Sequence, residues 1–177
     1  CCPFFEVGDT LNCGVVVYTY NNGQNGTICA FNDLADMAFG CSNNTGTSQT
    51  NGLNNSNLIN GVCTNSAATA CINYNPCGGG GWYLPASDEL MYVYNNVSLI
   101  NYVLYSLNFT PLNGGISTSS FGEGVFYWSS TSTAANQASV VVMGDLISAG
   151  LNAGSGFSGA GTKEKSSIGK IRPFKQF

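Results

Sequence analysis

Two acidic residues and a run of hydroxyl side chains are the groups in this sequence that could take part in catalysis. Asp88 and Glu89 are adjacent, and neighbouring positions of a helix point about 100° apart, so the pair cannot flank one substrate bond as an acid and a base do. Ser129, Ser130 and Thr131 offer nucleophiles, but a serine needs a base to activate it. Histidine is absent, and the lysines lie near the end of the chain. We therefore expect a protein without enzymatic activity.

Four carboxylates could supply oxygen ligands to a structural calcium ion, a cation that takes about six to eight of them. They are Asp33, Asp36, Glu123 and Asp145. They lie far apart in the chain, and no D-x-D-x-D-G loop brings them together. We expect no cofactor and no metal site, with a structural calcium ion as the alternative.

Cysteine is concentrated in the first half of the chain. Its eight positions are Cys1, Cys2, Cys13, Cys29, Cys41, Cys63, Cys71 and Cys77. Zinc sites favour C-x-x-C pairs or cysteine combined with histidine, and the chain has neither pattern. We therefore expect all eight to form disulfides, with metal ligands and free thiols as the alternatives. Their pairing stays open, because eight cysteines allow about a hundred connectivities.

The segment from Cys41 to Cys63 is rich in Asn, Thr and Ser and has few large apolar residues. Such a segment can hardly build a core of its own, so we expect an ordered but irregular loop over residues 42–60. A disulfide across its base would restrict the unfolded chain and add about 3 kcal/mol to the free energy of unfolding.

Size and charge narrow the class of protein. A chain of 177 residues fits one domain, residues 1–177, with a true hydrophobic core. Only 8% of the residues are charged, the formal net charge is -4, and the five basic residues lie between Lys163 and Lys175. Nucleic acid is therefore not expected as a partner, because a phosphate backbone attracts many cations. The apolar runs fall far short of the ~20 residues that span a bilayer, so we expect no membrane span.

A β-hairpin is predicted near the N-terminus. Residues 12–20 contain strong β-formers and run into NNGQNG, whose Asn-Gly pairs readily adopt positive φ, and residues 27–31 resume the strand pattern. In the next segment, Asn32 or Asp33 could cap one or two helical turns that end near Phe39.

The stretch GGGGWYLPASDEL, residues 78–90, predicts a loop, a buried anchor and the start of a helix. Its glycines let the chain turn before Trp82 is buried. Ser87 can cap the free N–H groups of a helix, and the two acids that follow it suit the positive end of the helix dipole. We expect this helix over Ser87–Asn95, continuing through Leu104.

Strands and turns dominate the remaining pattern. The predicted strands are Phe126–Ser130, Ser139–Asp145 and Lys170–Phe174. Trp128 is expected in the core, in a position to meet Trp82. A hairpin, two short helices and several strands are typical of an α+β fold with a mostly antiparallel sheet. Together with the cysteines, this order predicts an α+β domain with long disulfide-clamped loops.

Three separated motifs resemble a known family of bacterial surface domains. They are GVVVYTYNNGQNGTICAFNDL in the hairpin, GGWYLPASDELMYVYNN in the middle, and FYWSSTS followed by IGKIRPF near the end. In this order they resemble the Lcl C-terminal domain and the related Fibrobacter major paralogous domain, over nearly the whole chain. The matching residues are Gly81, Trp82, Leu84, Pro85, Glu89, Leu90, Tyr127 to Thr131, Arg172 and Phe174.

The resemblance implies a C-type-lectin-like fold and a place at the tips of surface fibres and adhesins. Ala86 departs from the family's Thr or Ser after the proline. The Glu-Pro-Asn and Trp-Asn-Asp motifs of calcium-dependent sugar binding are absent, so that activity is not carried over. The same holds for sulfatase activation, because no cysteine follows Cys77.

The first residue and the cysteines bear on localisation. The chain begins with Cys1 rather than Met, so we expect that a leader was removed or that a longer protein contains this segment. Disulfides predict an extracellular or cell-surface protein, and a lipid anchor at Cys1 is an alternative use of that residue.

We expect a non-enzymatic binding or adhesion domain that recognises a glycan or a surface protein. Its contact surface is predicted in the Gly-, Ser- and Asn-rich stretches 113–123 and 150–162, because surface loops carry the binding variation of a rigid scaffold. The candidate ligand-binding residues are Asn113, Ser119, Phe121, Glu123, Asn152 and Phe157. The alternative is a structural subunit of an extracellular filament, because low charge lets copies of the chain approach one another.

Overall fold

The structure, a computed structural model, describes residues 4–112, 126–143 and 159–177. A five-stranded antiparallel sheet has the order β1 (Thr10–Leu11), β2 (Gly14–Tyr20), β3 (Asn25–Ala30), β10 (Phe174–Gln176) and β5 (Trp82–Tyr83). A three-stranded antiparallel sheet contains β6 (Tyr127–Ser132), β7 (Gln137–Val141) and β8 (Ala160–Glu164). A short ladder joins β4 (Met37–Ala38) to β9 (Ile168–Gly169). The helices of the described residues are α1 (Gly52–Val62), α2 (Ala67–Ile72), α3 (Ser87–Asn95) and α4 (Val97–Ser106).

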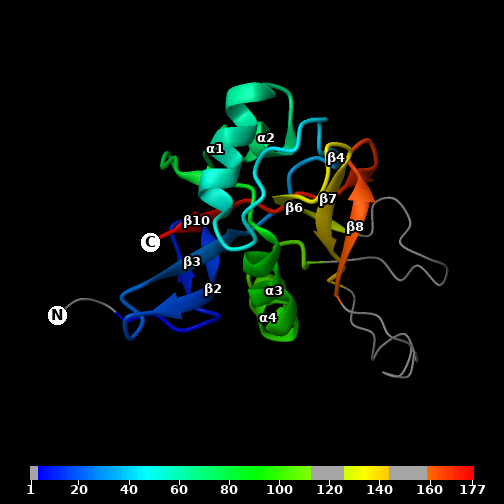
Figure 1. The fold of residues 1–177 in the computed structure, drawn as a ribbon. Coiled ribbons are helices and arrows are strands. Elements are labelled where there is room, and N and C mark those ends of the chain that lie inside the picture. The colour runs from blue at the N-terminus through cyan, green and yellow to red at the C-terminus, as the bar shows by residue number, and fades with distance from the viewer. Residues whose placement is uncertain (1–3, 113–125, 144–158) are drawn as a thin grey trace, which may run out of the picture.

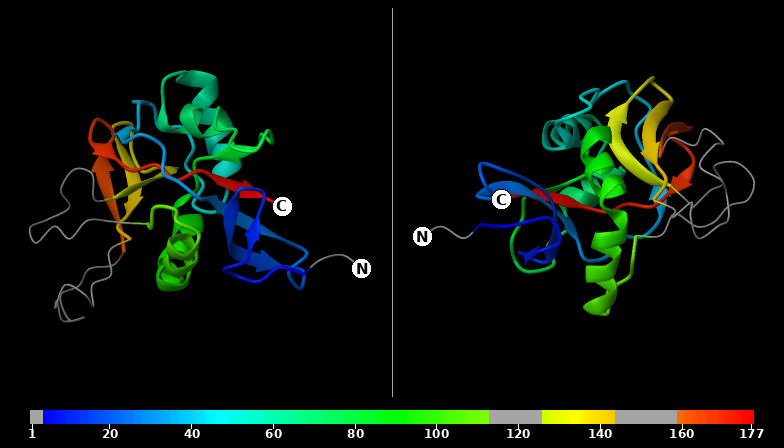
Figure 2. Two further views of the ribbon diagram at one scale, coloured as in Figure 1. Left: turned by 180° about the vertical axis from the view of Figure 1, so that it is seen from behind. Right: turned by 90° about the horizontal axis from the view of Figure 1, so that it is seen from below.

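The two larger sheets lie on opposite sides of the molecule (Figure 1). The pair α1 and α2 and the pair α3 and α4 lie on either side of the C-terminal chain, which crosses between the sheets (Figure 2). Strand β10 then inserts between β3 and β5, so the last residues join the first part of the chain. The predicted antiparallel α+β class is confirmed, but the described residues form four helices rather than two.

The predicted hairpin is confirmed as β2 and β3. Its turn places Asn21, Asn22 and Gly23 at positive φ, which hairpin turns of this kind require. The pairing register shifts between Val16 and Tyr18, so β2 contains a β-bulge. Beyond the bulge the alternation of side chains is reset, and the end of β2 directs its tyrosines to the face of the sheet that α3 covers.

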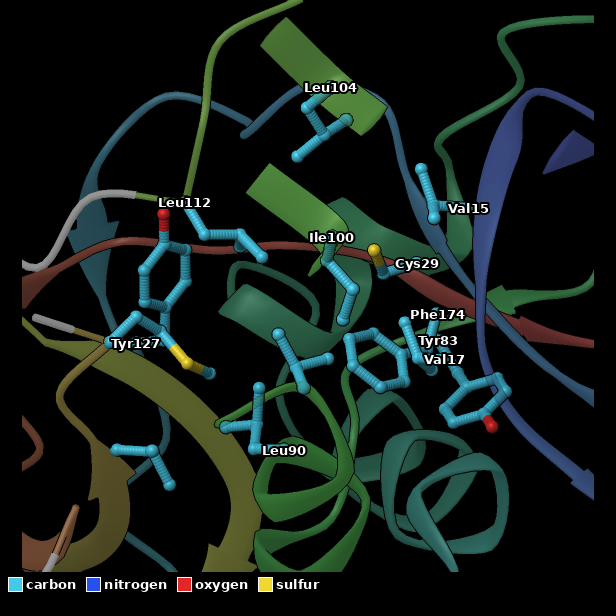
Figure 3. Close-up of a cluster of buried hydrophobic side chains, with 13 residues drawn as sticks. Val15, Val17, Cys29, Tyr83, Leu90, Ile100, Leu104, Leu112, Tyr127 and Phe174 are labelled. Atoms are coloured by element: carbon cyan, nitrogen blue, oxygen red, sulfur yellow. The ribbon is translucent and has the colours of Figure 1, made fainter. Parts of the chain in front are cut away.

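The main core lies between the five-stranded sheet and helices α3 and α4 (Figure 3). Val15 and Val17 of β2 are buried together with Leu90 of α3 and Ile100 of α4. Removing these side chains from water is the main favourable contribution to folding, at about 25 cal/mol for each Å² of apolar surface. This core fixes the two helices against the sheet.

The predicted helix from Ser87 is confirmed in two parts, α3 and α4. Asn96 separates them, with a φ of -121° and a side-chain Nδ2 that donates to the carbonyl oxygen of Tyr92 at 2.9 Å. Asparagine interrupts helices in this way because its amide competes for main-chain hydrogen bonds. The predicted cap at Ser87 is wrong, because Ala86 occupies the cap position.

A second core lies between α1, α2 and the three-stranded sheet. There Trp128 packs edge-to-face against Phe39 and Phe126, with ring centroids 5.5 and 5.1 Å away. Trp82 belongs to a different cluster, where the ring of Tyr74 meets it at 5.3 Å. Both tryptophans are buried, but the predicted meeting between them is wrong because separate clusters enclose them.

Residues 42–60, predicted as an irregular loop, contain most of helix α1. Asn51 caps the helix by accepting from the N–H of Asn54 at 2.9 Å. The inward side of the helix is only partly apolar, because Asn55 and Ser56 are buried beside Ile59, and Ser56 Oγ donates to the carbonyl oxygen of Leu84 at 3.1 Å. A helix that buries amides and hydroxyls lacks the apolar periodicity by which helices are predicted.

The predicted helical turns over Asn32–Phe39 are wrong, because this segment contains no helix and its residues Met37–Ala38 form β4. The N–H of Leu34 donates to the carbonyl oxygen of Ile171 at 2.9 Å, and the N–H of Phe39 donates to that of Lys165 at 3.0 Å. These partners come from the far end of the chain. They outweigh a weak local preference for helix.

The three strands predicted in the second half are confirmed in part. Strands β6 and β7 cover residues 127–132 and 137–141, close to the predicted 126–130 and 139–145, of which 144 and 145 lie outside the described residues. The predicted strand Lys170–Phe174 is wrong in its bounds, since β10 begins only at Phe174. Pro173 has no N–H for a sheet ladder, which explains the late start.

Two disulfides connect four of the six described cysteines. Cys41 and Cys63 close the base of the segment between them, a pairing that the sequence had left open, with Cα atoms 5.6 Å apart. Cys13 pairs with Cys77 across a Cα distance of 6.3 Å. This second bond ties the loop before Trp82 to the start of β2.

The prediction that all eight cysteines pair is wrong for Cys29 and Cys71, which are free thiols. Cys29 lies in the main core and Cys71 in the second core, so apolar side chains surround each of them. Burial raises the pKa of Cys29 to about 11 and raises that of Cys71 well above its usual value. Cys1 and Cys2 lie outside the described residues.

We expect iodoacetamide to leave Cys29 and Cys71 unmodified in the native protein and to label both once urea unfolds the chain without a reductant, because only an accessible thiolate reacts. Mass spectrometry of the peptides reads the result. Cys41 and Cys63 serve as controls that react only after reduction. Fast labelling of either buried thiol in native buffer at neutral pH would contradict this placement.

Candidate binding surface

The six predicted ligand-binding residues lie outside the described part of the chain. They are Asn113, Ser119, Phe121, Glu123, Asn152 and Phe157. Leu112 and Met143, which come directly before the two undescribed inner segments, are both buried in the main core. The predicted stretch 113–123 directly follows Leu112, and the prediction of a loop over 150–162 is wrong for residues 160–162, which belong to strand β8.

Two of the four calcium candidates are described, and both pair with cations. Asp36 Oδ1 lies 3.8 Å from Lys170 Nζ, and Asp33 pairs with Arg172. The two candidates outside the described residues are Glu123 and Asp145. Within residues 4–112, 126–143 and 159–177, no three Cys, Asp or Glu side chains form a group that could hold a metal ion.

Arg172 is the centre of a buried ionic network. Its Nε lies 2.7 Å from Asp33 Oδ1, and its Nη1 donates to the carbonyl oxygen of Ala30 at 2.9 Å. The hydroxyl of Tyr127 donates to Asp33 Oδ2 at 2.9 Å. Burial raises the pKa of Asp33, against the pull of the Arg172 charge. Burial lowers the pKa of Arg172, but the Asp33 carboxylate together with Cys29 and Tyr127 outweighs this effect, and the pKa is raised.

Glu89 connects the start of α3 to α1 and β5. Its carboxylate is buried and accepts from the Tyr83 hydroxyl at 2.8 Å, the Ala86 N–H at 2.8 Å and the Gly52 N–H at 3.1 Å. Burial raises the pKa of Glu89, and these hydrogen bonds oppose the rise. The carboxylate caps α3 in place of the hydroxyl that the sequence suggested.

The hydroxyl run of β6 lies beside a lysine. Lys165 Nζ donates to Ser132 Oγ at 3.0 Å and to the carbonyl oxygen of Asn43 at 2.7 Å, and Ser132 Oγ donates to that of Thr45 at 2.7 Å. Both side chains are buried, and burial lowers the pKa of Lys165. A serine and a lysine can act as nucleophile and base. Here both donate to main-chain carbonyls, and the contact holds residues 43–45 against β6.

The three motifs of the family resemblance meet in the fold. Strand β5 of the middle motif pairs with β10 of the last motif. Strand β6 joins the middle motif where the Ser130 N–H donates to the carbonyl oxygen of Pro85 at 2.7 Å. It contacts IGKIRPF, the second part of its own motif, where the Trp128 N–H donates to the carbonyl oxygen of Lys170 at 3.0 Å. The motif residues thus form the main-chain contacts that hold β5, β6 and β10 together. We call these contacts, with the buried polar contacts described above, the frame.

Three tyrosines form a partly exposed row of rings, named here the tyrosine row, which consists of Tyr18, Tyr20 and the half-buried Tyr92. The rings of Tyr18 and Tyr92 are stacked, with centroids 4.2 Å and planes 10° apart, and the ring of Tyr20 lies 6.2 Å from that of Tyr18. Tyr18 exposes 37% of its surface and Tyr20 49%. Regular alternation along β2 would have turned both away from α3. The bulge, which the sequence pattern does not predict, turns both tyrosines toward α3.

Helix α4 exposes a second aromatic surface, named here the α4 outer face. Leu99, Tyr102 and Tyr105 expose 45%, 72% and 76% of their surfaces and recur every three residues, so they share one side of the helix. The other side buries Ile100 and Leu104 in the main core. No helix in the described part of the chain is long and apolar enough to cross a membrane.

Two surfaces and a frame of buried polar contacts are thus available for assigning a function. No family model and no curated protein matches the sequence. A function therefore has to be inferred from the chemistry of the exposed side chains that take no part in the buried polar contacts.

Proposed function

We propose that this chain is a non-catalytic recognition domain that acts outside the cell and binds a glycan or a surface protein. The proposal includes a C-type-lectin-like fold and a place in a bacterial adhesin or surface fibre, as the resemblance to the Lcl C-terminal domain implies. One observation supports this proposal. The buried charged side chains bind other parts of the chain and thereby stabilise the fold.

These stabilising contacts join segments that are far apart in the described chain. Arg172 and Asp33 pair in the interior, Glu89 caps α3, and Lys165 holds the segment before α1. The outer groups that remain are mostly neutral amides, hydroxyls and tyrosines, which bind by shape, hydrogen bonding and stacking. The two disulfides limit the motion of the frame, which lowers the entropy that binding costs, and they fit an oxidising compartment.

A binding screen with the purified chain tests this function. Immobilised glycans and surface proteins are probed with the wild type and with Phe121→Ala and Phe157→Ala, which change the predicted loops. We expect saturable binding that at least one loop variant weakens roughly tenfold, the effect of losing one aromatic contact. Phe4→Ala, whose side chain is 60% exposed outside these loops, is the matched control. A measurable turnover without any saturable binding would overturn the proposal.

The α4 outer face supports one alternative, a structural subunit of an extracellular filament. The helix contains no charged residue, and aromatic side chains are enriched where proteins meet. Sedimentation velocity of the same preparations separates the two functions. Assembly that grows with concentration and is abolished by Tyr102→Lys, together with an empty binding screen, would favour the filament.

A further inference from the structure

The tyrosine row is suited to one chemical class of ligand. We propose that Tyr18, Tyr20 and Tyr92 form a platform for the rings of a neutral saccharide. This inference rests on the proposed recognition function and narrows its ligand class. It places the contact on β2 and α3, away from the two loops that the sequence suggests.

The first argument is the order of the rings. Tyr18 and Tyr92 come from different elements and fix one another by stacking at 4.2 Å, and Tyr20 continues the row at a tilt of 31°. Rigid tyrosines supply contact area while they lose little conformational entropy on binding. A sugar ring presents C–H groups on its faces and hydroxyls at its rim, which match an aromatic body with a polar tip.

The second argument is the set of amides beside the row. Asn25 lies opposite Tyr20 in the hairpin register, and its Oδ1 accepts a hydrogen bond from Asn21 Nδ2 at 3.0 Å. Exposed Asn22 and Gln24 lie in the same turn. Side-chain amides donate and accept hydrogen bonds, as sugar hydroxyls do. The combination of aromatic ring and neighbouring amide therefore fits a saccharide.

The third argument is charge. Strands β2 and β3 and their turn contain no charged residue, and the five basic residues of the chain lie between Lys163 and Lys175. Asp88 lies one helical turn before Tyr92 and adds a negative charge near the row. An anionic glycan would be repelled here. A protein partner would favour an apolar centre, whereas side-chain amides border this row.

Native affinity electrophoresis of the full chain tests the proposal. The gels contain mannan, laminarin or hydroxyethylcellulose as neutral polysaccharides, and heparin as an anionic one. We expect at least one neutral polysaccharide to retard the wild type, and Tyr18→Ala and Tyr20→Ala to weaken this binding roughly tenfold. Tyr18→Phe keeps the ring and is expected to keep the binding. Tyr105→Ala, which removes an exposed tyrosine from the α4 outer face, is the matched control.

Each outcome decides the inference. Thermal unfolding identifies any variant that fails to fold, and Tyr20→Ala, which changes a half-exposed side chain, then replaces Tyr18→Ala in the comparison. If the tyrosine variants bind a neutral polysaccharide like the wild type while Phe121→Ala or Phe157→Ala does not, the row is not the site, although the recognition function stands. Retardation by heparin alone, or by no polysaccharide, overturns the inference. Saturable binding of a protein alone, lost in Tyr18→Ala, assigns the row to a protein partner instead.

Discussion

Replacing Glu89 by alanine is expected to lower the free energy of unfolding by about 4 kcal/mol. Glu89 is 5% exposed, and its carboxylate accepts hydrogen bonds from the Tyr83 hydroxyl and from the N–H groups of Ala86 and Gly52. Without it, buried donors lose their acceptor, and each such loss costs about 1–3 kcal/mol. Urea unfolding followed by circular dichroism, with the disulfides intact, measures the change.

The neighbouring acid provides the control for this variant. Asp88→Ala removes a carboxylate from the same helical turn and is expected to cost less than about 1 kcal/mol, the strength of an exposed interaction with the helix dipole. Equal losses for the two variants would show that proximity to the helix end, rather than the buried hydrogen bonds, explains the effect of Glu89.

The pH dependence gives a second measurement on Glu89. Its pKa in the folded protein is raised above the usual 4.5, so the folded state holds the proton more tightly than the unfolded chain. The stabilisation that this proton contributes is fully present below pH 4.5 and is lost as the pH rises through the raised pKa. Glu89→Gln keeps an acceptor oxygen but cannot ionise. The difference in stability between wild type and this variant should therefore change over that pH range, and a constant difference would contradict the raised pKa.

Replacing Arg172 by methionine is expected to lower the free energy of unfolding by about 3–5 kcal/mol. The variant keeps an apolar stem but leaves the Asp33 carboxylate without its cation. It also removes the donors to the carbonyl oxygens of Ala30 and Thr110, at 2.9 and 3.3 Å. An uncompensated charge in the interior is costly because water cannot solvate it. Thermal and urea unfolding measure the loss.

A surface ion pair in the same segment supplies the matched control. Lys170 and Asp36 lie 3.8 Å apart with side chains 24% and 40% exposed, so Lys170→Met is expected to change stability by less than about 1 kcal/mol. Combining Arg172→Met with Asp33→Asn removes the isolated charge and should recover part of the loss. Similar costs for the two single variants, or no recovery in the combined one, would argue against a buried charge as the cause.

Local patterns could be predicted wherever the signal lies within a few residues. The Asn-Gly turn predicts the hairpin because it needs positive φ at adjacent positions, and the structure places Asn21 and Asn22 there. The start of α3 could be predicted because the polar residues Ser87 to Glu89 precede a segment with helical apolar periodicity.

Predictions from local sequence patterns were wrong where a residue's interaction partner lies far away in the sequence. Helix α1 buries amides and hydroxyls whose acceptors come from other elements, so its inward side reads as only partly apolar. Residues 32–39 form no helix, because their main chain is hydrogen-bonded to the C-terminal part of the chain. Ser132 and Lys165 lie 33 positions apart in sequence, yet their side chains meet at 3.0 Å.

Strand β2 shows, within one element, which properties of the tyrosine row could be predicted from the sequence and which could not. The composition of β2 predicts that Tyr18 and Tyr20 belong to a strand, but a single bulge decides which face of the sheet they occupy and therefore that Tyr18 stacks on Tyr92. A shift of one residue reverses the direction of every later side chain. Short-range spacing cannot reveal such a shift.

The sequence by itself determined the antiparallel α+β class, the hairpin and the helix after Trp82, because turn chemistry and periodicity act over a few neighbouring residues. The tertiary structure alone decided which thiols pair, which charges are buried and which tyrosines form a row. The contact between Glu89 and the N–H of Gly52 spans 37 positions. It forms only when two helix starts and β5 are packed together, and a free energy that depends on such packing is not a property of any short stretch of sequence.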